Sequence, residues 1–280
     1  MAIAKNANLL WRKQMKERGL TGFQLKIIGL ILMVFDHIHE FFNYSGNIPV
    51  AFNWVGRIVA PIFIFMIIEG YTHTKSKKKY MLRLFSGSVI MNIGNHVLPT
   101  YFQRTDNLGL MNNIFSTLFM ITVYLCIIDY IEDARKEKNA LKTFGGVLLL
   151  IAPIVLGMIF IIGGGSGNML FLYLALIIPT PIFVEGGPIF VLLGIIMYML
   201  RKDRKKLITA YIIMSLAFIF TGKLSITGLF MENYQWMMVF AAPLFYLYNG
   251  QKGRGMKYLF YIFYPTHIYV FYIISCLMMK

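Results

Sequence analysis

The sequence predicts an all-α fold, a polytopic bundle of transmembrane helices with about ten apolar segments. Of the 280 residues, 58% are hydrophobic and only 14% are charged, whereas soluble domains carry about a quarter charged residues. The apolar residues gather into runs that approach the roughly 20 residues a helix needs to cross a bilayer. Because no intervening loop is long enough to form a soluble domain, we expect residues 23–280 to form a single transmembrane domain.

The predicted segments follow one another along the chain at about residues 24–43, 49–70, 81–98, 111–131, 144–162, 168–184, 186–200, 207–221, 236–248 and 257–279. The sixth and seventh are interrupted by Pro179, Pro181 and the sequence Gly186-Gly187-Pro188. Broken helices at membrane depth are tolerated where they face protein or a cavity. One or both of these segments are therefore expected to be broken or re-entrant.

Basic clusters between the segments predict the orientation in a cell membrane. Lys and Arg total 27 against 12 Asp and Glu, which gives a net charge of +15. Cytoplasmic loops are enriched in Lys and Arg, so the N-terminus, with residues 1–22 as a basic segment, is predicted to be cytoplasmic. The same arrangement, short clusters between apolar runs, argues against a nucleic-acid partner. Ten complete crossings would place residues 201–206 outside, so the number of crossings and the side of the C-terminus stay open.

Two classes of feature are not expected. The basic N-terminal stretch has no apolar core and no small-residue cleavage site, so no cleavable signal peptide is predicted. Cys126 and Cys276 both lie in apolar runs and give neither a disulfide framework nor the spacing of metal ligands. We therefore expect no metal.

The first segment is the most informative stretch, because ionisable residues interrupt an otherwise apolar run. Lys26 lies near one end, and Asp36, His37 and Glu40 lie near the other. Such groups are costly to bury and usually face a cavity, a partner or a substrate. Lys26 and His37 share a helix face, about 16 Å apart along the axis. A cation at the cytoplasmic rim and an imidazole deeper in suit a long anionic donor. The alternatives are a snorkelling lysine and a histidine satisfied within the core.

The two carboxylates of this segment have different expected partners. Adjacent helical residues do not face each other, so Asp36 is poorly placed to orient His37, and Glu40, one turn on, has the better spacing. Asp36 is expected to pair instead with Arg57 of the second segment, at the same depth. The alternative is that such ion pairs only fix the register of the helices.

The cytoplasmic end of the second segment carries a second polar layer. Glu69 and His73 are expected level with Lys26, and the basic run 75–79 and Arg83 follow. Phosphates of a nucleotide-bearing molecule would find Lys77, Lys78, Lys79 and Arg83 favourable. The alternative is that these charges only signal topology.

Other polar residues lie farther along the chain. Amides and hydroxyls of the third and fourth segments are expected to bridge helices; they include Asn92, Asn95, Asn113, Ser116 and Thr117. In the last segment, the sequence Tyr264-Pro265-Thr266-His267 places a helix break beside a histidine. A cavity-lining role and a packing role are both open for it.

These residues make the chain resemble the TraX family, membrane proteins named for N-terminal acetylation of conjugative pilin. The resemblance covers most of the chain, with little signature between about 140 and 240. It rests on Asp36-His37-Ile38, Gly56-Arg57-Ile58, Pro61-Ile-Phe63, Glu69-Gly70-Tyr71, His73-Thr74, Lys79-Tyr80, Arg83-Leu84, Asn113-Ile-Phe-Ser-Thr-Leu118 and Tyr264-Pro-Thr-His267. The block around Glu69, followed by the basic run, is its most specific part.

The resemblance implies an acetyltransferase that takes its acyl group from cytosolic acetyl-CoA. TraX-like proteins also look related to acyltransferase-3-type membrane enzymes, in which an Arg of the first span and a His eleven residues later are important. Here those positions are Lys26 and His37. Lysine keeps the positive charge but lacks the bidentate fork of arginine.

The resulting hypothesis is an integral-membrane acyltransferase with His37 as the general base, or as a transient acetyl carrier. Asp36 and Arg57 complete the predicted catalytic group, with Arg57 stabilising the thioester oxygen or positioning Asp36. The predicted donor-binding residues are Lys26, Glu69, His73, Lys77, Lys78, Lys79 and Arg83. The predicted acceptor-binding residues are Glu40, Asn113, Tyr264 and His267. The expected partners are the bilayer and an acceptor, either a peptide N-terminus or a glycan.

Two other classes of function are compatible with these residues. A proton-coupled permease would use the polar residues as a translocation path and residues 168–200 as a gate, although no inverted repeat is evident. A scaffold would use the ion pairs only for structure. Acyl length and oligomeric state are not predicted.

Overall fold

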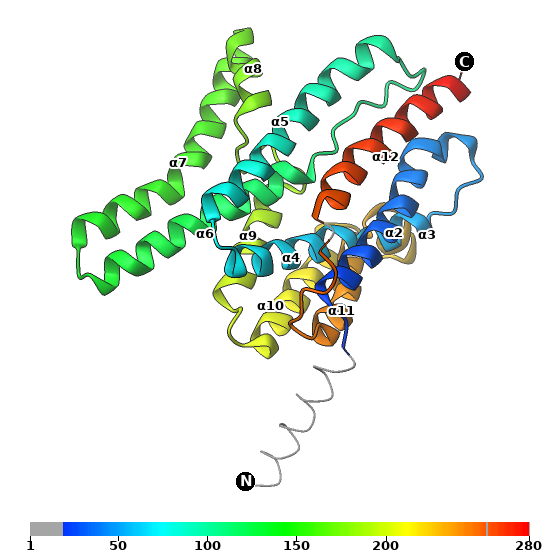
Figure 1. The fold of residues 1–280 in the computed structure, drawn as a ribbon. Helices are drawn as coiled ribbons and strands as arrows, with labels where there is room; N and C mark the ends of the chain where they lie inside the picture. Colours follow the sequence, from blue (N-terminus) through cyan, green and yellow to red (C-terminus); the bar gives the residue numbers. More distant parts are fainter. Residues whose placement is uncertain (1–18, 256, 280) are drawn as a thin grey trace, which may run out of the picture. The chain divides into compact units, whose positions relative to one another are not determined.

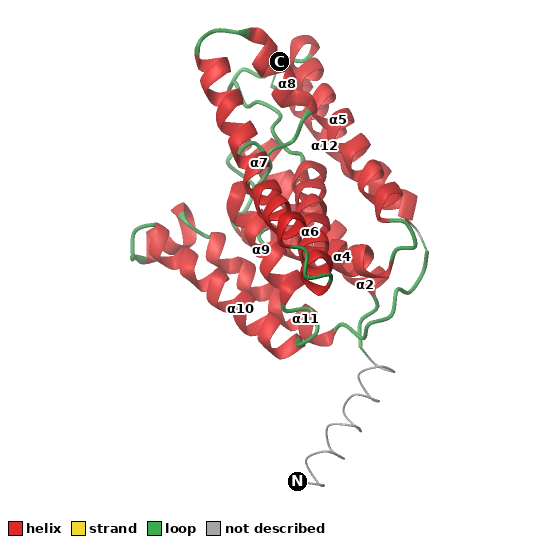
Figure 2. Ribbon diagram, turned by 90° about the vertical axis from the view of Figure 1, so that its left-hand side faces the viewer, coloured by secondary structure: helices red, strands yellow, loops and turns green. Residues whose placement is uncertain are grey.

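All regular secondary structure is helical in the computed structural model, which describes residues 19–255 and 257–279. Figure 2 shows helices joined by loops, with no strand among the described residues. In that part of the chain, one isolated bridge between Leu20 and Tyr248 is the only β-type pairing. The all-α prediction is confirmed. Most of the predicted N-terminal segment, residues 1–18, lies outside the described residues.

The described residues fall into two compact units. The first comprises residues up to 66 together with 200–271, and the second comprises 67–199 together with the residues from 272. Two helices, α4 (Val59–His73) and α12 (Lys257–Met278), contribute residues to both units. That residues 23–280 act as a single domain stays a prediction.

The first unit is built around α2 (Gly22–Phe42). Besides α2 and its parts of α4 and α12, it contains η1 (Asn43–Ser45), α3 (Ala51–Gly56), α10 (Arg204–Ala217), η2 (Phe218–Thr221), η3 (Gly228–Glu232), η4 (Gln235–Ala241) and α11 (Ala242–Leu247). A capping box starts α2: Gln24 N donates to Thr21 Oγ1 at 3.3 Å, and Thr21 N donates to Gln24 Oε1 at 2.8 Å. This double cap fixes where the helix that carries His37 begins.

Backbone hydrogen bonds and stacked aromatic rings hold the first unit together. Leu20 N donates to Leu247 O at 2.9 Å, which ties the chain before α2 to the end of α11. The ring of Phe245 stacks on that of Phe65 at 4.7 Å and meets that of Tyr211 edge-on at 4.9 Å. Such ring pairs add to the burial of apolar area. This aromatic core anchors α4, α10 and α11 within the unit.

The second predicted segment is interrupted where α3 meets α4. At the junction, Arg57 N and Ile58 N donate to carbonyls three residues back, at 3.2 Å each. Pro61 has no N–H, so the carbonyl of Arg57 has no helical donor at that position. The break therefore follows from the sequence, and it places Arg57 at a helix end.

The second unit is centred on α6 (Ile114–Lys136), which packs against α5 (Lys77–Tyr101), α7 (Ala140–Gly165) and α9 (Gly187–Met199). In Figure 1, α6 and α7 run side by side and are joined by a short turn. The remaining helix is α8 (Met169–Ile177). Asn113 caps α6 and Asn139 caps α7, each accepting a backbone N–H through its side chain.

The prediction of about ten apolar transmembrane segments is not supported. Among the described residues, four helical stretches are long and apolar enough to cross a membrane: Ala51–His73, Ile114–Lys136, Ala140–Gly165 and Tyr258–Met278. The predicted segments at 168–184, 186–200 and 207–221 form helices of 9, 13 and 14 residues. All three are shorter than the roughly 20 residues of a crossing. Turns that contain Pro179, Pro181 and Gly186 separate the first two.

Candidate functional site

Two polar groupings lie in the first unit, and the first is a pair of buried histidines. His37 Nδ1 lies 2.6 Å from His267 Nε2, and the two residues are 5% and 7% exposed. Glu40 Oε2 lies 3.7 Å from the other ring nitrogen of His37. Tyr264, also buried, completes the surroundings, with its ring 6.5 Å from that of His37. We call these four residues the histidine cluster.

The hydrogen bonds of this cluster assign the proton positions on both rings. His267 Nδ1 lies 2.7 Å from the carbonyl oxygen of Phe263, so Nδ1 carries the proton and donates it. In the neutral ring, His267 Nε2 is then an acceptor, and His37 Nδ1 donates to it. The lone pair of His37 is thereby placed on Nε2, the nitrogen nearest Glu40. This arrangement gives a base whose gained proton would face a carboxylate.

The second grouping surrounds Arg57 and is called the arginine cluster. Arg57 Nη2 donates to Asp36 Oδ1 at 2.9 Å and to Asn53 Oδ1 at 2.7 Å. Arg57 Nη1 lies 3.4 Å from Gln235 Oε1, and the guanidinium stacks 5.6 Å from the ring centre of Tyr234. The ion pair predicted between Asp36 and Arg57 is present, with side chains that are 19% and 27% exposed. Because four neighbours hold the guanidinium, its direction is fixed.

Gly56 allows this ion pair to form. A Cβ atom at Gly56 would lie 2.0 Å from Asp36 Oδ1, closer than real contacts allow. The absence of a side chain therefore lets α3 approach α2 at the level of Asp36. The pairing depends on Gly56 as well as on the two charged residues.

Lys26 lies apart from the histidine cluster on α2. Its Nζ is 5.2 Å from the ring centre of Phe260. Eleven residues of helix separate it from His37, about 16 Å along the axis. The predicted spacing on α2 is thus retained, with Lys26 over an aromatic ring.

In the second unit, a carboxylate within an apolar helix collects three donors, and we call it the aspartate cluster. Asp129 Oδ2 accepts from Lys77 Nζ at 2.5 Å and from Tyr71 Oη at 2.9 Å. Asp129 Oδ1 accepts from the hydroxyl of Tyr198. The charge of Lys77 is therefore largely met by Asp129, which reduces its capacity to bind a phosphate.

The other residues of the predicted donor-binding set differ in how they are held. Lys78 and Lys79 are exposed on the first turn of α5. The Arg83 guanidinium lies 5.6 Å from the ring centre of Tyr80, and its buried Nε has no hydrogen-bond partner. His73 Nδ1 lies 2.9 Å from the carbonyl oxygen of Glu69 and 3.9 Å from Glu69 Oε2. These five residues belong to the second unit, whereas Lys26 belongs to the first.

Asn113 is the predicted acceptor-binding residue that lies outside the first unit. Its Nδ2 donates to Ser88 O at 2.9 Å and to Asn92 Oδ1 at 2.5 Å. Its Oδ1 accepts from Ser116 N at 3.2 Å. Every polar atom of the side chain is engaged, which is the geometry of an amide that bridges helices.

Comparison with known proteins identifies the family. A family model described as TraX protein matches residues 21–275. The chain belongs to the TraX family. It is similar to the "Probable fimbrial assembly protein FimC, serogroup H1" of Dichelobacter nodosus, with 23% identity over 256 residues, which cover 89% of this chain and 93% of that protein. No solved structure gives a significant match to this TraX-family chain. Together with the four long apolar helices, the family indicates a membrane protein.

Within this TraX-family chain, the structure brings some predicted residues together and leaves others apart. One cluster contains four of the predicted residues: His37, Glu40, Tyr264 and His267. The predicted pair of Asp36 and Arg57 lies in the same unit. Three residues of these clusters were not predicted from the sequence: Asn53, Tyr234 and Asp129. A carboxylate at position 129, within an apolar run, was the signal for the last of these. Asn53 and Tyr234 lie in segments whose pattern gave no such signal.

Proposed function

We propose that this TraX-family protein is an integral-membrane acetyltransferase that moves an acetyl group from acetyl-CoA to an amine or hydroxyl acceptor. The observation that carries the proposal is the buried pair His37–His267, which leaves an imidazole lone pair on His37 Nε2. Histidine is the side chain that most often serves as a general base. The family membership supports the same chemistry.

In the proposed reaction, His37 Nε2 accepts the proton of the acceptor amine or hydroxyl while that atom attacks the thioester carbon. The new C–N or C–O bond forms, and the C–S bond of acetyl-CoA breaks. His37 then returns the proton to the leaving thiolate, which departs as coenzyme A. Glu40, 3.7 Å from Nε2, favours the imidazolium in the interval. A transient acetyl-imidazole on His37 is the alternative path.

Arg57 is proposed to stabilise the negative charge that develops on the thioester oxygen. Its guanidinium is held by Asp36 and Asn53, so little reorganisation would be needed during the reaction. Asp36 then acts as a positioning residue. Tyr264 and Glu40, which surround His37, are proposed to contact the acceptor.

The phosphates of acetyl-CoA are proposed to bind basic residues on the cytoplasmic side. Lys78 and Lys79 are exposed, and Arg83 has a buried Nε without a hydrogen-bond partner, so these three are the stronger candidates. Lys26 is proposed as a further contact on α2, and Glu69 and His73 as residues that shape the entry of the donor. Lys77 is the weaker candidate because it pairs with Asp129.

The name of the Dichelobacter nodosus relative refers to fimbrial assembly. It favours the N-terminal amine of a fimbrial or pilin subunit over a glycan hydroxyl as the acceptor. We also propose a multi-pass arrangement in the cell membrane with a cytoplasmic N-terminus, in keeping with the basic clusters.

The test is turnover of labelled acetyl-CoA by the purified full chain with a peptide bearing a free N-terminus. His37→Gln should reduce transfer by about 10²- to 10⁴-fold, the usual contribution of a general base. His96→Gln is the matched control, because His96 is exposed on α5, and it should transfer as the wild type does. Undiminished transfer by His37→Gln would refute the assignment of the base.

A second measurement separates an enzyme from a permease. Coenzyme A should raise the melting temperature of an acetyltransferase in proportion to its binding, whereas a permease for an unrelated solute should not respond. A null response, together with no transfer, would favour the permease.

A further inference from the structure

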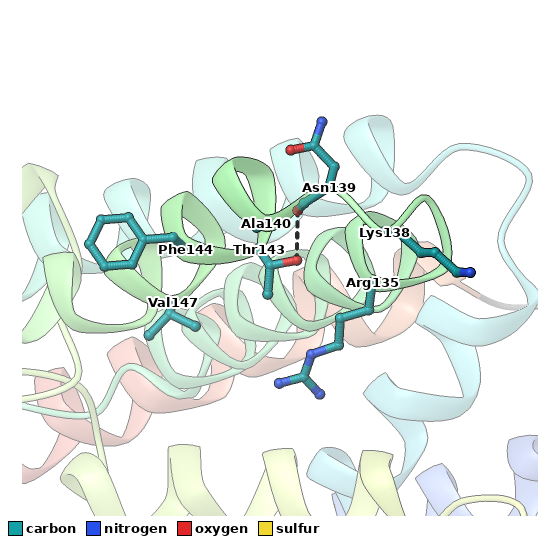
Figure 3. A pocket seen from close by; sticks show the side chains of 7 residues that line it. All are labelled: Arg135, Lys138, Asn139, Ala140, Thr143, Phe144 and Val147. Carbon is teal, nitrogen blue, oxygen red and sulfur yellow. Dashed lines mark hydrogen bonds between the residues drawn. The ribbon is translucent and has the colours of Figure 1, made fainter.

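An open depression of about 510 Å³ lies on the second unit where α6 turns into α7 (Figure 3). Its lining residues are Arg135, Lys138, Asn139, Ala140, Thr143, Phe144 and Val147. It involves none of the residues assigned above to catalysis or donor binding. α7 is also the most apolar of the four long helices.

The two cations of this depression differ from their neighbours in charge pairing. Lys136 pairs with Asp133 at 2.8 Å, and Lys142 pairs with Glu137 at 2.7 Å. Arg135 and Lys138 have no ion-pair partner among the described residues, and both are exposed. The local excess of positive charge is therefore concentrated on the residues that line the depression.

Lys138 occupies a left-handed turn between α6 and α7. Its φ is +53°, a left-handed conformation that glycine or asparagine usually supplies at a helix end. Lys138 N donates to Arg135 O at 3.1 Å, and Asn139 N donates to Ala134 O at 3.0 Å, which hold that turn. Lys138 is thus a charged residue at a position where a lysine backbone is strained.

Two uncharged polar oxygens of the depression are hydrogen-bonded to its own backbone. Asn139 Oδ1 accepts from Lys142 N at 2.9 Å, and the Thr143 hydroxyl donates to Asn139 O at 2.9 Å, the dashed line in Figure 3. A nucleotide base, which needs hydrogen bonds to its edge, would find few partners here. Apart from the Asn139 amide nitrogen, the groups that face outward are positive charge at one end and carbon at the other.

The apolar end continues along α7. Phe144 is 60% and Val147 is 40% exposed, and they lie on the opposite side of the depression from Lys138 (Figure 3). Farther along the same helix, Ile151, Val155 and Ile162 are also exposed. On a helix that crosses a membrane, such side chains face lipid tails.

We propose that this depression binds one anionic phospholipid, with its phosphate at Arg135 and Lys138 and an acyl chain along Phe144 and Val147. Basic residues directly beside an apolar membrane helix are the arrangement that recognises anionic headgroups. The apolar wall decides for a lipid over a free phosphate ion, which would make no use of Phe144. This lipid site requires only that the chain is a membrane protein, and it does not depend on the proposed acetyltransferase activity.

The experiment is native mass spectrometry of the purified full chain in detergent, titrated with dioleoylphosphatidylglycerol. The test variant is Arg135→Gln with Lys138→Gly, since glycine suits the left-handed turn. The control is Lys136→Gln with Lys142→Gln, which removes the same number of positive charges from outside the depression. The wild type and the control should retain one lipid, and the test variant should bind it at least about tenfold more weakly.

Three further arms complete the test. Phe144→Ser should weaken retention of the lipid, and phosphatidylcholine should bind more weakly than phosphatidylglycerol. Inorganic phosphate in excess should not displace the lipid. The proposal is overturned if the control loses lipid as much as the test variant, if both lipids bind equally, or if phosphate competes. It is also overturned if the test variant loses coenzyme A instead of lipid, because the depression would then be a nucleotide site.

Discussion

His37 and His267 are separated by 230 residues in the sequence, yet Nδ1 of the first and Nε2 of the second lie 2.6 Å apart. Because the Phe263 carbonyl fixes the proton of His267 on Nδ1, this contact orients His37 and sets its tautomer. His267 is thus a positioning residue in the proposed reaction. From the sequence it was expected only to contact the acetyl acceptor, to line a cavity or to pack within the bundle.

Replacing His267 tests this positioning role. His267→Leu removes the acceptor for His37 Nδ1, so kcat should fall by about 10²-fold, within the range of general-base effects. The side-chain oxygen of His267→Gln can still accept a hydrogen bond from His37 Nδ1, so this variant should recover part of the lost kcat. The measurement is kcat and KM for acetyl-CoA and for the peptide in both variants. A raised peptide KM with unchanged kcat would instead assign His267 to acceptor binding.

The ion pair of Asp36 and Arg57 gives a test of catalysis against scaffolding. Arg57→Ala leaves a largely buried carboxylate without its cation and should lower the free energy of unfolding by about 1–3 kcal/mol, less than for a fully buried pair because both side chains are partly exposed. The double variant Asp36→Ala with Arg57→Ala should be more stable than the sum of the single changes predicts.

The activity of that double variant decides the role. If Arg57 stabilises the thioester oxygen, the double variant folds but transfers acetyl groups about 10²-fold more slowly. If the pair is only structural, transfer by the folded double variant equals that of the wild type. Denaturant unfolding and acetyl transfer are measured on the same preparations.

Gly56 provides a test of packing at the same place. Gly56→Ala puts a methyl group where Asp36 Oδ1 now lies and should cost about 1–3 kcal/mol by overpacking, with loss of the ion-pair geometry. Gly145→Ala on α7 is the matched control, since no atom beyond its own stretch of helix lies within 4 Å of the added methyl. It should be neutral or stabilising by up to about 1 kcal/mol, because alanine favours helix. Equal melting temperatures for the two variants would contradict the close approach.

The sequence predicts the part of this site that depends on local chemistry. Ionisable side chains in an apolar run indicate a functional position, and opposite charges at equal depth predict the pair of Asp36 and Arg57, which is present. The contact of His37 with His267 joins α2 to α12, and helix periodicity alone carries no information about which helices meet. Asp129 met the same criterion as Asp36, but its partners Tyr71, Lys77 and Tyr198 lie on other helices, which the sequence alone does not place beside it.

The lengths of several helices could not be predicted from the sequence either. Runs such as 168–200 are apolar throughout, so composition alone indicates spans, but Pro179 and Pro181 lack the N–H that a continuing helix needs. Gly186 and Gly187 adopt φ values of +74° and +59° and turn the chain. These residues signalled a break, whereas the shortness of the helices on either side depends on packing within the unit.

The loop between α5 and α6 supports a prediction of pH dependence. Arg104 donates to Asp106 Oδ1 at 2.9 Å and to Oδ2 at 2.6 Å, and these hydrogen bonds lower the pKa of Asp106 to about 2. The ordinary pKa of aspartate is about 3.9. Because the folded pKa lies below that of the unfolded chain, the stabilisation is complete above about pH 4 and is lost as the pH falls toward 2.

Asp106→Asn removes this contribution. Between pH 5 and pH 2, the melting temperature of the variant should fall less steeply than that of the wild type, and above pH 4 the variant should be the less stable protein. Asp133→Asn is the control, because its pair with Lys136 is largely exposed on both sides and contributes little. Parallel curves for the wild type and Asp106→Asn would show that Arg104, which also donates to the Ser275 hydroxyl, does not need this carboxylate.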